Sequence, residues 1–141
     1  MTEKLSVDDY PVAEQRPELV RGSRGKRLDE ITLDALQAGE VGIEDLRRTP
    51  EALRQQAEIS RAAGRAALAD NFERAAEMAL IPQQTIMEFY ELLRPGRAAD
   101  KQALLDAAAR LRSEFSAPRM AAFVEEAAEV YARRGLFKYR Y

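Results

Sequence analysis

Apolar residues recur at helical spacing through most of the chain, and no segment alternates β-branched and polar residues as a strand does. Between residues 82 and 93, Ile86, Phe89, Tyr90 and Leu93 follow the i, i+3, i+4, i+7 spacing of a helix with one buried face. The same criterion predicts helices over about 65–79, 100–115 and 118–134. Their apolar faces would be formed by Leu68, Phe72, Ala75 and Ala79; by Leu104, Ala108, Leu111 and Phe115; and by Met120, Val124, Ala127, Ala128 and Tyr131. The fold class predicted from this pattern is all-α.

Capping residues define one further long helix. Thr49-Pro50-Glu51 combines a side chain that caps, a proline preset for the first helical position and a carboxylate at the positive end of the helix dipole. This helix should run to Ala63, because Gly64 can adopt the left-handed conformation that closes a helix.

Weaker helix signals precede it. A short helix is expected over Asp29–Ala38, with Thr32 as a cap and Gly39 at its end. One helical turn is expected over Ile43–Arg47.

The first 27 residues differ from the rest of the chain. They contain Pro11, Pro17 and the flexible run Gly22-Ser23-Arg24-Gly25, and their apolar residues are isolated. We expect an extended N-terminal arm over residues 1–27, ordered by lying on its own core or on a partner. Residues 28–141 would form one helical domain, a compact bundle of five or six short helices.

An aromatic tail follows the last predicted helix. The segment LFKYRY carries Leu136, Phe137, Tyr139 and Tyr141 after a stop at Gly135. Folding back onto its own domain and contacting a partner are both open for this tail.

Composition narrows the chemistry. Among 141 residues there is no histidine and no cysteine, which excludes a Ser-His-Asp triad, thiolate catalysis and the usual zinc sites. Acidic pairs such as Asp8-Asp9, Asp29-Glu30 and Glu125-Glu126 could supply an autonomous carboxylate enzyme, but neighbours on a helix point in different directions. We expect no catalytic, cofactor-binding or metal-binding residue in this chain.

Nucleic acid is not an expected partner. The 22 basic and 24 acidic residues nearly balance, so no strong positive field attracts phosphates. The basic run Arg21, Arg24, Lys26 and Arg27 lacks interleaved aromatic residues. The helix–Gly–helix around Gly64 resembles a helix-turn-helix reader, yet its second helix carries two arginines against three acidic residues, the wrong sign for such a helix.

A membrane is not an expected partner either. No apolar run approaches the length of a bilayer span, and the start MTEKLSVDDYP lacks the apolar segment of a signal peptide. We expect a soluble, cytoplasmic protein.

Most of residues 9–134 resembles the small (gamma) subunit of adenosylcobalamin-dependent diol and glycerol dehydratases. Three motifs carry most of the resemblance: T-P-E-x-L-R-x-Q-A, A-G-R followed by N-F-E-R-A-A-E, and L-R-P-x-R. The resembling segments are Asp9-Tyr10-Pro11, LDEITLDAL (28–36), TPEALRQQAEISRAAGRAALADNFERAAEM (49–78), IPQQTIMEFYELLRPGR (81–97) and MAAFVEEAAEVYARR (120–134).

The resemblance implies a holoenzyme that is a dimer of αβγ trimers and removes water from propane-1,2-diol, glycerol or ethane-1,2-diol. Adenosylcobalamin and a metal ion would be held by the large and medium subunits and not by this chain. The small subunit would pack on the large one and supply no catalytic group. Family members packaged into microcompartments often carry a longer N-terminal extension, and eight residues precede Asp9 here, so encapsulation through this subunit is not expected.

Protein binding is therefore the function that the sequence predicts. For each candidate interface residue, a local ion pair or a helix cap is the competing interpretation. A free-standing helical adaptor without dehydratase partners is the alternative from another class. The candidate interface residues are Tyr10, Pro11, Arg47, Arg65, Asn71, Arg74, Arg94 and Arg97.

Overall fold

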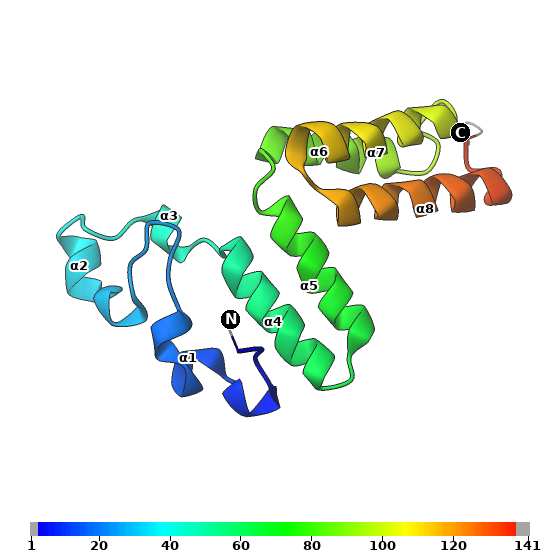
Figure 1. The fold of residues 1–141 in the computed structure, drawn as a ribbon. Helices are drawn as coiled ribbons and strands as arrows, with labels where there is room; N and C mark the ends of the chain where they lie inside the picture. The colour runs from blue at the N-terminus through cyan, green and yellow to red at the C-terminus, as the bar shows by residue number, and fades with distance from the viewer. Residues whose placement is uncertain (1–2, 138–141) are drawn as a thin grey trace. The chain divides into compact units, whose positions relative to one another are not determined.

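The computed structural model describes residues 3–137, and every helix or strand element in that range is helical (Figure 1). One isolated β-bridge joins Arg21 and Arg27. The prediction of an all-α fold is confirmed. The helices are α1 (Val12–Gln15), α2 (Leu33–Gln37), α3 (Ile43–Leu46), α4 (Pro50–Ala62), α5 (Ala66–Met78), α6 (Gln83–Leu93), α7 (Lys101–Phe115) and α8 (Pro118–Arg134), with 3-10 turns at Val7–Asp9, Pro17–Leu19 and Leu28–Glu30.

The described residues group into two compact units, which meet in the sequence between Ala79 and Leu80. The division into an arm and a helical domain at residue 27 stays a prediction. Each unit has its own helical hairpin and its own buried residues, so each is described by itself.

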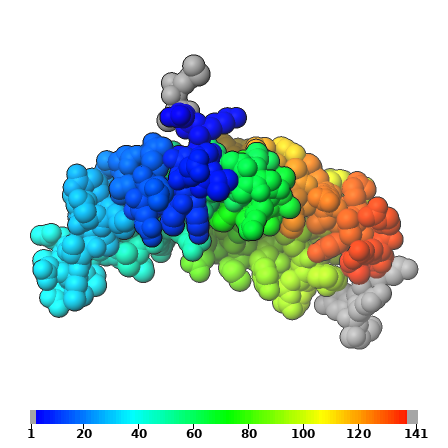
Figure 2. All heavy atoms as spheres, turned by 90° about the horizontal axis from the view of Figure 1, so that it is seen from below, coloured from blue at the N-terminus to red at the C-terminus, as the bar shows by residue number. Residues whose placement is uncertain are grey.

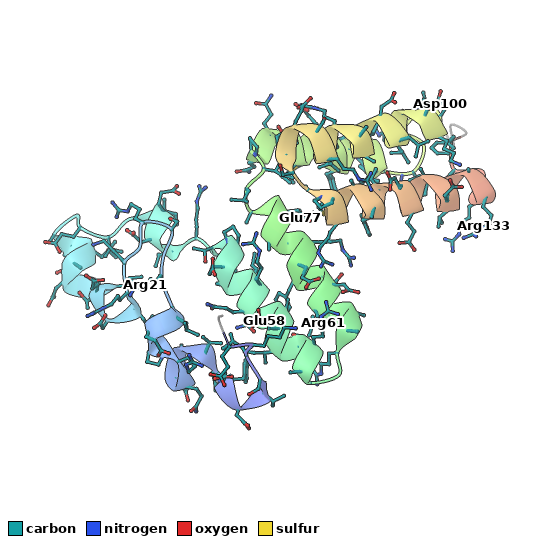
Figure 3. The ribbon with its side chains drawn as sticks, in the orientation of Figure 1. Arg21, Glu58, Arg61, Glu77, Asp100 and Arg133 are labelled. Carbon is teal, nitrogen blue, oxygen red and sulfur yellow. The ribbon has the colours of Figure 1, made fainter. Side chains whose placement is uncertain are left out.

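The first unit is built on the α4–α5 hairpin. The hydroxyl of Thr49 accepts the Ala52 N–H at 3.1 Å, as the sequence predicts for a cap. Gly64 turns the chain with φ +73°, a conformation that costs other residues more. Arg61 ties the two helices together, because its guanidinium lies 3.0 Å from Asp70 (Figure 3).

The packed face of α5 differs from the predicted one. Ala69 and Ala76 are almost fully buried, Leu68 is 39% exposed, and Ala79 is exposed. Close approach of two helices selects the smallest side chains for the contact, so the buried stripe runs through alanines. The larger Leu68 is left toward the outside, where it becomes available for other contacts.

The N-terminal arm lies on this hairpin. Leu5 and Val12 pack with Ile59 of α4 in a small buried cluster. The Leu5 N–H donates to a carboxylate oxygen of Glu58 at 3.0 Å, and Figure 2 shows the arm, in blue, beside residues of the hairpin, in green. The arm therefore contacts its own core, and its contact with a partner stays a prediction.

The short helix predicted over Asp29–Ala38 begins later than expected. Thr32 accepts the Ala35 N–H at 3.1 Å, so the helix starts after Thr32 as α2 and ends before Gly39 (φ +76°). The preceding residues form the 3-10 turn Leu28–Glu30, because Glu30 and Arg27 make a local cap there.

The second unit packs α6, α7 and α8 around a larger core. Leu104, Leu111 and Val124 are the largest fully buried side chains, and Ala108 and Ala121 allow α7 and α8 to approach closely. The carboxylate of Asp100 caps α7 by accepting the Ala103 N–H at 2.9 Å (Figure 3). The predicted faces of α7 and α8 are mostly buried, with Phe115, Ala127 and Tyr131 half-buried. On α6, Phe89 is buried while Tyr90 is 58% exposed.

The described part of the tail folds back onto this unit. Gly135 adopts φ +66°, and the Leu136 N–H donates to the carbonyl of Tyr131 at 2.9 Å, which closes α8. The ring of Phe137 then meets that of Tyr131 edge to face at 6.2 Å. Tyr139 and Tyr141 lie outside the described residues.

Candidate functional site

In each acidic pair singled out by the sequence, one carboxylate is ion-paired with an arginine of this chain. In the three acidic pairs singled out by the sequence, Asp9 lies 3.0 Å from Arg16, Asp29 lies 2.6 Å from Arg27, and Glu125 pairs with Arg112. Among residues 3–137, no three side chains of the metal-binding types gather at one place. No helix in the described range has the length and apolar content needed to cross a bilayer.

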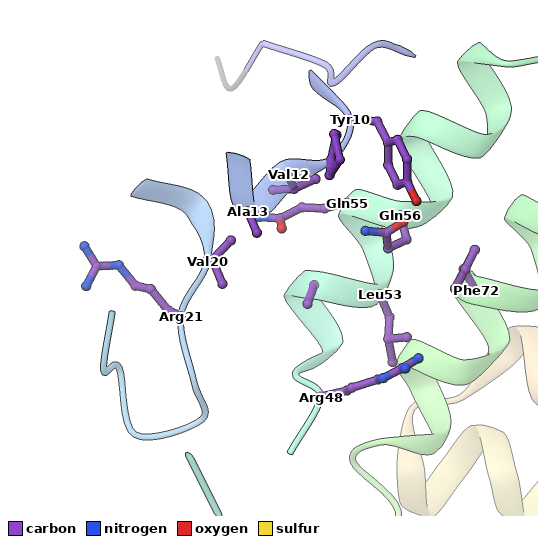
Figure 4. Close-up of a pocket in the computed structure, with 12 residues that line it drawn as sticks. Tyr10, Val12, Ala13, Val20, Arg21, Arg48, Leu53, Gln55, Gln56 and Phe72 are labelled. Atoms are coloured by element: carbon purple, nitrogen blue, oxygen red, sulfur yellow. The ribbon is translucent and has the colours of Figure 1, made fainter. Parts of the chain in front are cut away.

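The first unit is hollowed where the arm meets the α4–α5 hairpin (Figure 4). The arm contributes Tyr10, Pro11 and Val12 to one wall, and Gln56 and Phe72 come from the hairpin. The hollow has a volume of about 430 Å³ and a mostly apolar lining.

A second hollow of about 450 Å³ adjoins the first. Both are lined by Tyr10, Gln56 and Phe72, and the second adds Val7 and Leu68. We call the two hollows together the arm groove. Concave apolar surface with a few polar groups is the geometry of a site that receives side chains of another molecule.

Tyr10 is held at this position by the turn that precedes it. The side chain of Ser6 accepts the Asp8 N–H, and the carboxylate of Asp9 accepts the Ser6 N–H at 2.8 Å. The Ser6 N–H and the Arg16 guanidinium hold the pKa of the Asp9 carboxyl below its usual value. Tyr10 caps the turn with 59% of its surface exposed, so the turn is fixed while the ring is left available.

Three predicted interface residues lie around the arm groove. Tyr10 and Pro11 line the first hollow, and Tyr10 and Arg65 line the second. These residues come from the arm and from the start of α5, more than fifty positions apart in the sequence.

The other predicted residues have partners close to them in the sequence. Arg47 lies 3.3 Å from Glu44, and Arg74 donates to the side chain of Asn71. In the second unit, Arg94 lies 3.2 Å and Arg97 4.0 Å from Glu91. These five residues therefore make the local pairs that were the competing interpretation. Their role in an interface stays a prediction.

Sequence reasoning missed several exposed apolar residues of the first unit. Leu33, Leu36, Ile43 and Leu46 are all more than half exposed. Their signal was present in the sequence, because helices of four or five residues are too short to bury an apolar face of their own.

Comparison with known proteins identifies the chain's relatives. Residues 5–138 match the model of a family described as dehydratase small subunit. The chain belongs to the dehydratase small subunit family. It is 46% identical over 132 residues to the propanediol dehydratase small subunits of Citrobacter freundii and Salmonella typhimurium (strain LT2), an alignment that covers 94% of this chain and 76% of each relative.

Membership of a small-subunit family implies partner subunits. The first unit has a groove and exposed apolar residues on its surface. The side chains of residues 3–137 do not fit a resident metal ion, and the sequence offers no histidine or cysteine to bind one.

Proposed function

We propose that this chain is the small, non-catalytic subunit of an adenosylcobalamin-dependent dehydratase that converts 1,2-diols to aldehydes by radical elimination of water. The substrates in this proposal are propane-1,2-diol, glycerol and ethane-1,2-diol. The observation that carries it is the family match over residues 5–138, reinforced by 46% identity to small subunits named for propanediol dehydratase.

The partners in this proposal are a large and a medium subunit, assembled with this chain as a dimer of αβγ trimers. Adenosylcobalamin and the metal ion belong to those subunits. The absence of histidine and cysteine from this chain and the local ion pairing of its acidic pairs support that division. The proposed location is the cytoplasm, where a cysteine-free chain needs no oxidising environment.

The role proposed for this chain is to stabilise the large subunit by binding it through the arm groove. Apolar side chains of the large subunit would fill the hollows beside Tyr10 and Phe72 and remove apolar surface from water on both sides. Binding only to the folded partner raises the stability of that partner by mass action.

An omission experiment tests this role. The large and medium subunits are purified with and without this chain, and the rate of aldehyde formation with added adenosylcobalamin is followed before and after heating. The proposal predicts that preparations lacking this chain lose activity at a lower temperature. Adding the chain should restore the higher temperature of inactivation. Equal activity and equal heat resistance without the chain would overturn it.

A further inference from the structure

The charged side chains that line the arm groove all carry a positive charge. Arg21 and Arg48 line its first hollow and Arg65 lines the second, and no aspartate or glutamate lines either one. In the whole chain, by contrast, 24 acidic residues outnumber 22 basic ones. The groove therefore combines a mostly apolar lining with cationic groups at its edges.

Two of these arginines have no partner among the described residues. The side chains of Arg48 and Arg65 are exposed and make no ion pair or hydrogen bond with residues 3–137. Arg21 differs, because its guanidinium donates to the carbonyl of Gly25 at 3.2 Å and is directed away from the other labelled lining residues in Figure 4. Arg48 and Arg65 are therefore the cations that the groove offers to another molecule.

The wall shared by the two hollows also carries a polar group that the described part of the chain leaves unbonded. Gln56 lines both hollows and is half-buried, and its side-chain amide makes no hydrogen bond within residues 3–137. An amide offers donors and an acceptor, and covering it without a partner costs free energy. An occupant of the groove must therefore bring a polar group to this point.

The two arginines lie at opposite ends of α4. Arg48 comes just before the helix and Arg65 just after it, and the 13 residues of α4 span about 20 Å. The lining residues that α4 contributes begin at Ala52 and continue, turn by turn, to Ala63 beyond its end. An occupant that reaches both arginines is therefore elongated and lies along α4.

We propose that the arm groove binds an amphipathic helix of the large dehydratase subunit, which carries a carboxylate near each end of its apolar stripe. The carboxylates pair with Arg48 and Arg65, apolar side chains enter the hollows beside Phe72, and a polar side chain bonds to Gln56. The identity of the partner rests on the proposed function.

The lining favours a helix over other occupants. An extended segment would bury backbone N–H and C=O groups against a wall that offers few hydrogen-bonding partners, whereas a helix satisfies these groups itself. A nucleic acid would leave the apolar hollows unfilled, and a bilayer surface does not enter a concave groove. A second copy of this chain is the competing occupant, and the experiment separates it.

The experiment measures the Kd of charge-reversal variants for the co-purified large and medium subunits. R48E and R65E each reverse one cation of the groove. R54E is the matched control, because Arg54 is exposed and lies about 200° around α4 from Gln56, on the opposite side of the helix. Since Arg48 and Arg65 have no partner within residues 3–137, circular dichroism and thermal melts of both variants should match the wild-type chain.

We expect Kd to rise about tenfold or more in R48E and in R65E, and to stay near the wild-type value in R54E. Salt should weaken the wild-type complex and the R54E complex alike, and should weaken the other two less, because an attractive charge pair has been removed. A photo-crosslinking p-azidophenylalanine in place of Tyr10 should attach to a peptide of the large subunit that has acidic residues around apolar ones at helical spacing.

Wild-type affinity in R48E or in R65E would overturn the inference. So would crosslinks to a peptide without acidic residues, or crosslinks only between copies of this chain. Failure of the wild-type chain to bind the co-purified subunits at all is a different result, and it would overturn the proposed function itself.

Discussion

Tyr10 lines both hollows of the arm groove, as Gln56 and Phe72 do, and it is 59% exposed. Exposed aromatic rings beside apolar hollows are typical of residues that dominate the energy of protein interfaces. The same exposure means that the fold of this chain gains little from the ring, so its effect on binding can be measured without disturbing the fold.

For Tyr10→Ala we expect at least a tenfold weaker complex with the dehydratase subunits, which corresponds to about 1.4 kcal/mol. Tyr90→Ala is the matched control, because Tyr90 is 58% exposed but lies on α6 in the other unit. Kd is measured by titration, for example by biolayer interferometry. Equal affinities for the two variants would remove Tyr10 from the interface.

Gly64 contributes to the fold by turning the chain after α4. Its φ of +73° is costly for an L-residue, whereas Gly42 has an ordinary φ of −130°, and neither has an atom within 4 Å of an added Cβ. We expect Gly64→Ala to lower the free energy of unfolding by about 1 kcal/mol and Gly42→Ala, at the N-cap of α3, to lower it by less. Urea denaturation measures both, and equal loss in the two variants would contradict a conformational origin.

At the scale of elements, the close contact of α7 with α8 depends on alanines. Ala108 is completely buried between them, and Ala122 on α8 is exposed. Ala108→Leu should destabilise the chain by about 1–3 kcal/mol through overpacking, while Ala122→Leu should change stability by less than about 0.5 kcal/mol. Chemical denaturation of both variants checks this, and a tolerated leucine at position 108 would show that the contact is loose.

The contact between the loop Gly22–Gly25 and α3 predicts that the stability of the fold depends on pH. The Arg24 guanidinium and then the Gly42 N–H lower the pKa of Asp45 to about 2 from its usual value of 3.8. A carboxyl with a lower pKa in the folded state contributes stability above the unfolded pKa and loses it as pH falls toward the folded pKa. That contribution is therefore complete near neutral pH and disappears as pH falls from 3.8 toward 2.

Asp45→Asn should accordingly reduce stability near neutral pH, and its deficit relative to the wild-type chain should shrink as the pH falls through this window. Asp34→Asn, at an exposed position of α2, is the control and should show no deficit. Urea denaturation at about pH 6 and about pH 3 gives both differences. A deficit in Asp45→Asn that is independent of pH would contradict the proposed origin.

The sequence predicted the helix ends that depend on residues close together in the chain. Thr49, Gly64, Gly39 and Gly135 cap or close helices as expected, because a cap depends on residues only a few positions away. The buried stripe of α5 was predicted wrongly, since it depends on how closely α4 approaches.

The candidate site was predicted only in part, for a related reason. Tyr10, Pro11 and Arg65 were selected, but that they share one groove follows from the arm folding onto α4 and α5, which no periodicity in the chain reports. The exposure of Leu33 and Leu36 was missed because an apolar residue in a helix is ordinarily read as core.

At the scale of the whole molecule, the two units differ in how much apolar surface they bury. Within residues 3–137, the first unit exposes nine large apolar side chains, including Leu33 and Ile43, and the second exposes four. The second unit has the larger buried cluster. Exposed apolar surface of this extent marks protein contacts, so we expect the first unit to contribute most of the contact with the partner subunits.

We propose that this chain works by binding dehydratase partners, and size-exclusion chromatography with light scattering is the first experiment to test this. The chain is run alone and after co-expression with candidate large and medium subunits. We expect co-elution in a complex whose mass fits two copies of each of three chains and which forms aldehyde only with adenosylcobalamin. Elution of the chain alone at about its own mass of 15.9 kDa in the presence of both partners would instead indicate a free-standing adaptor.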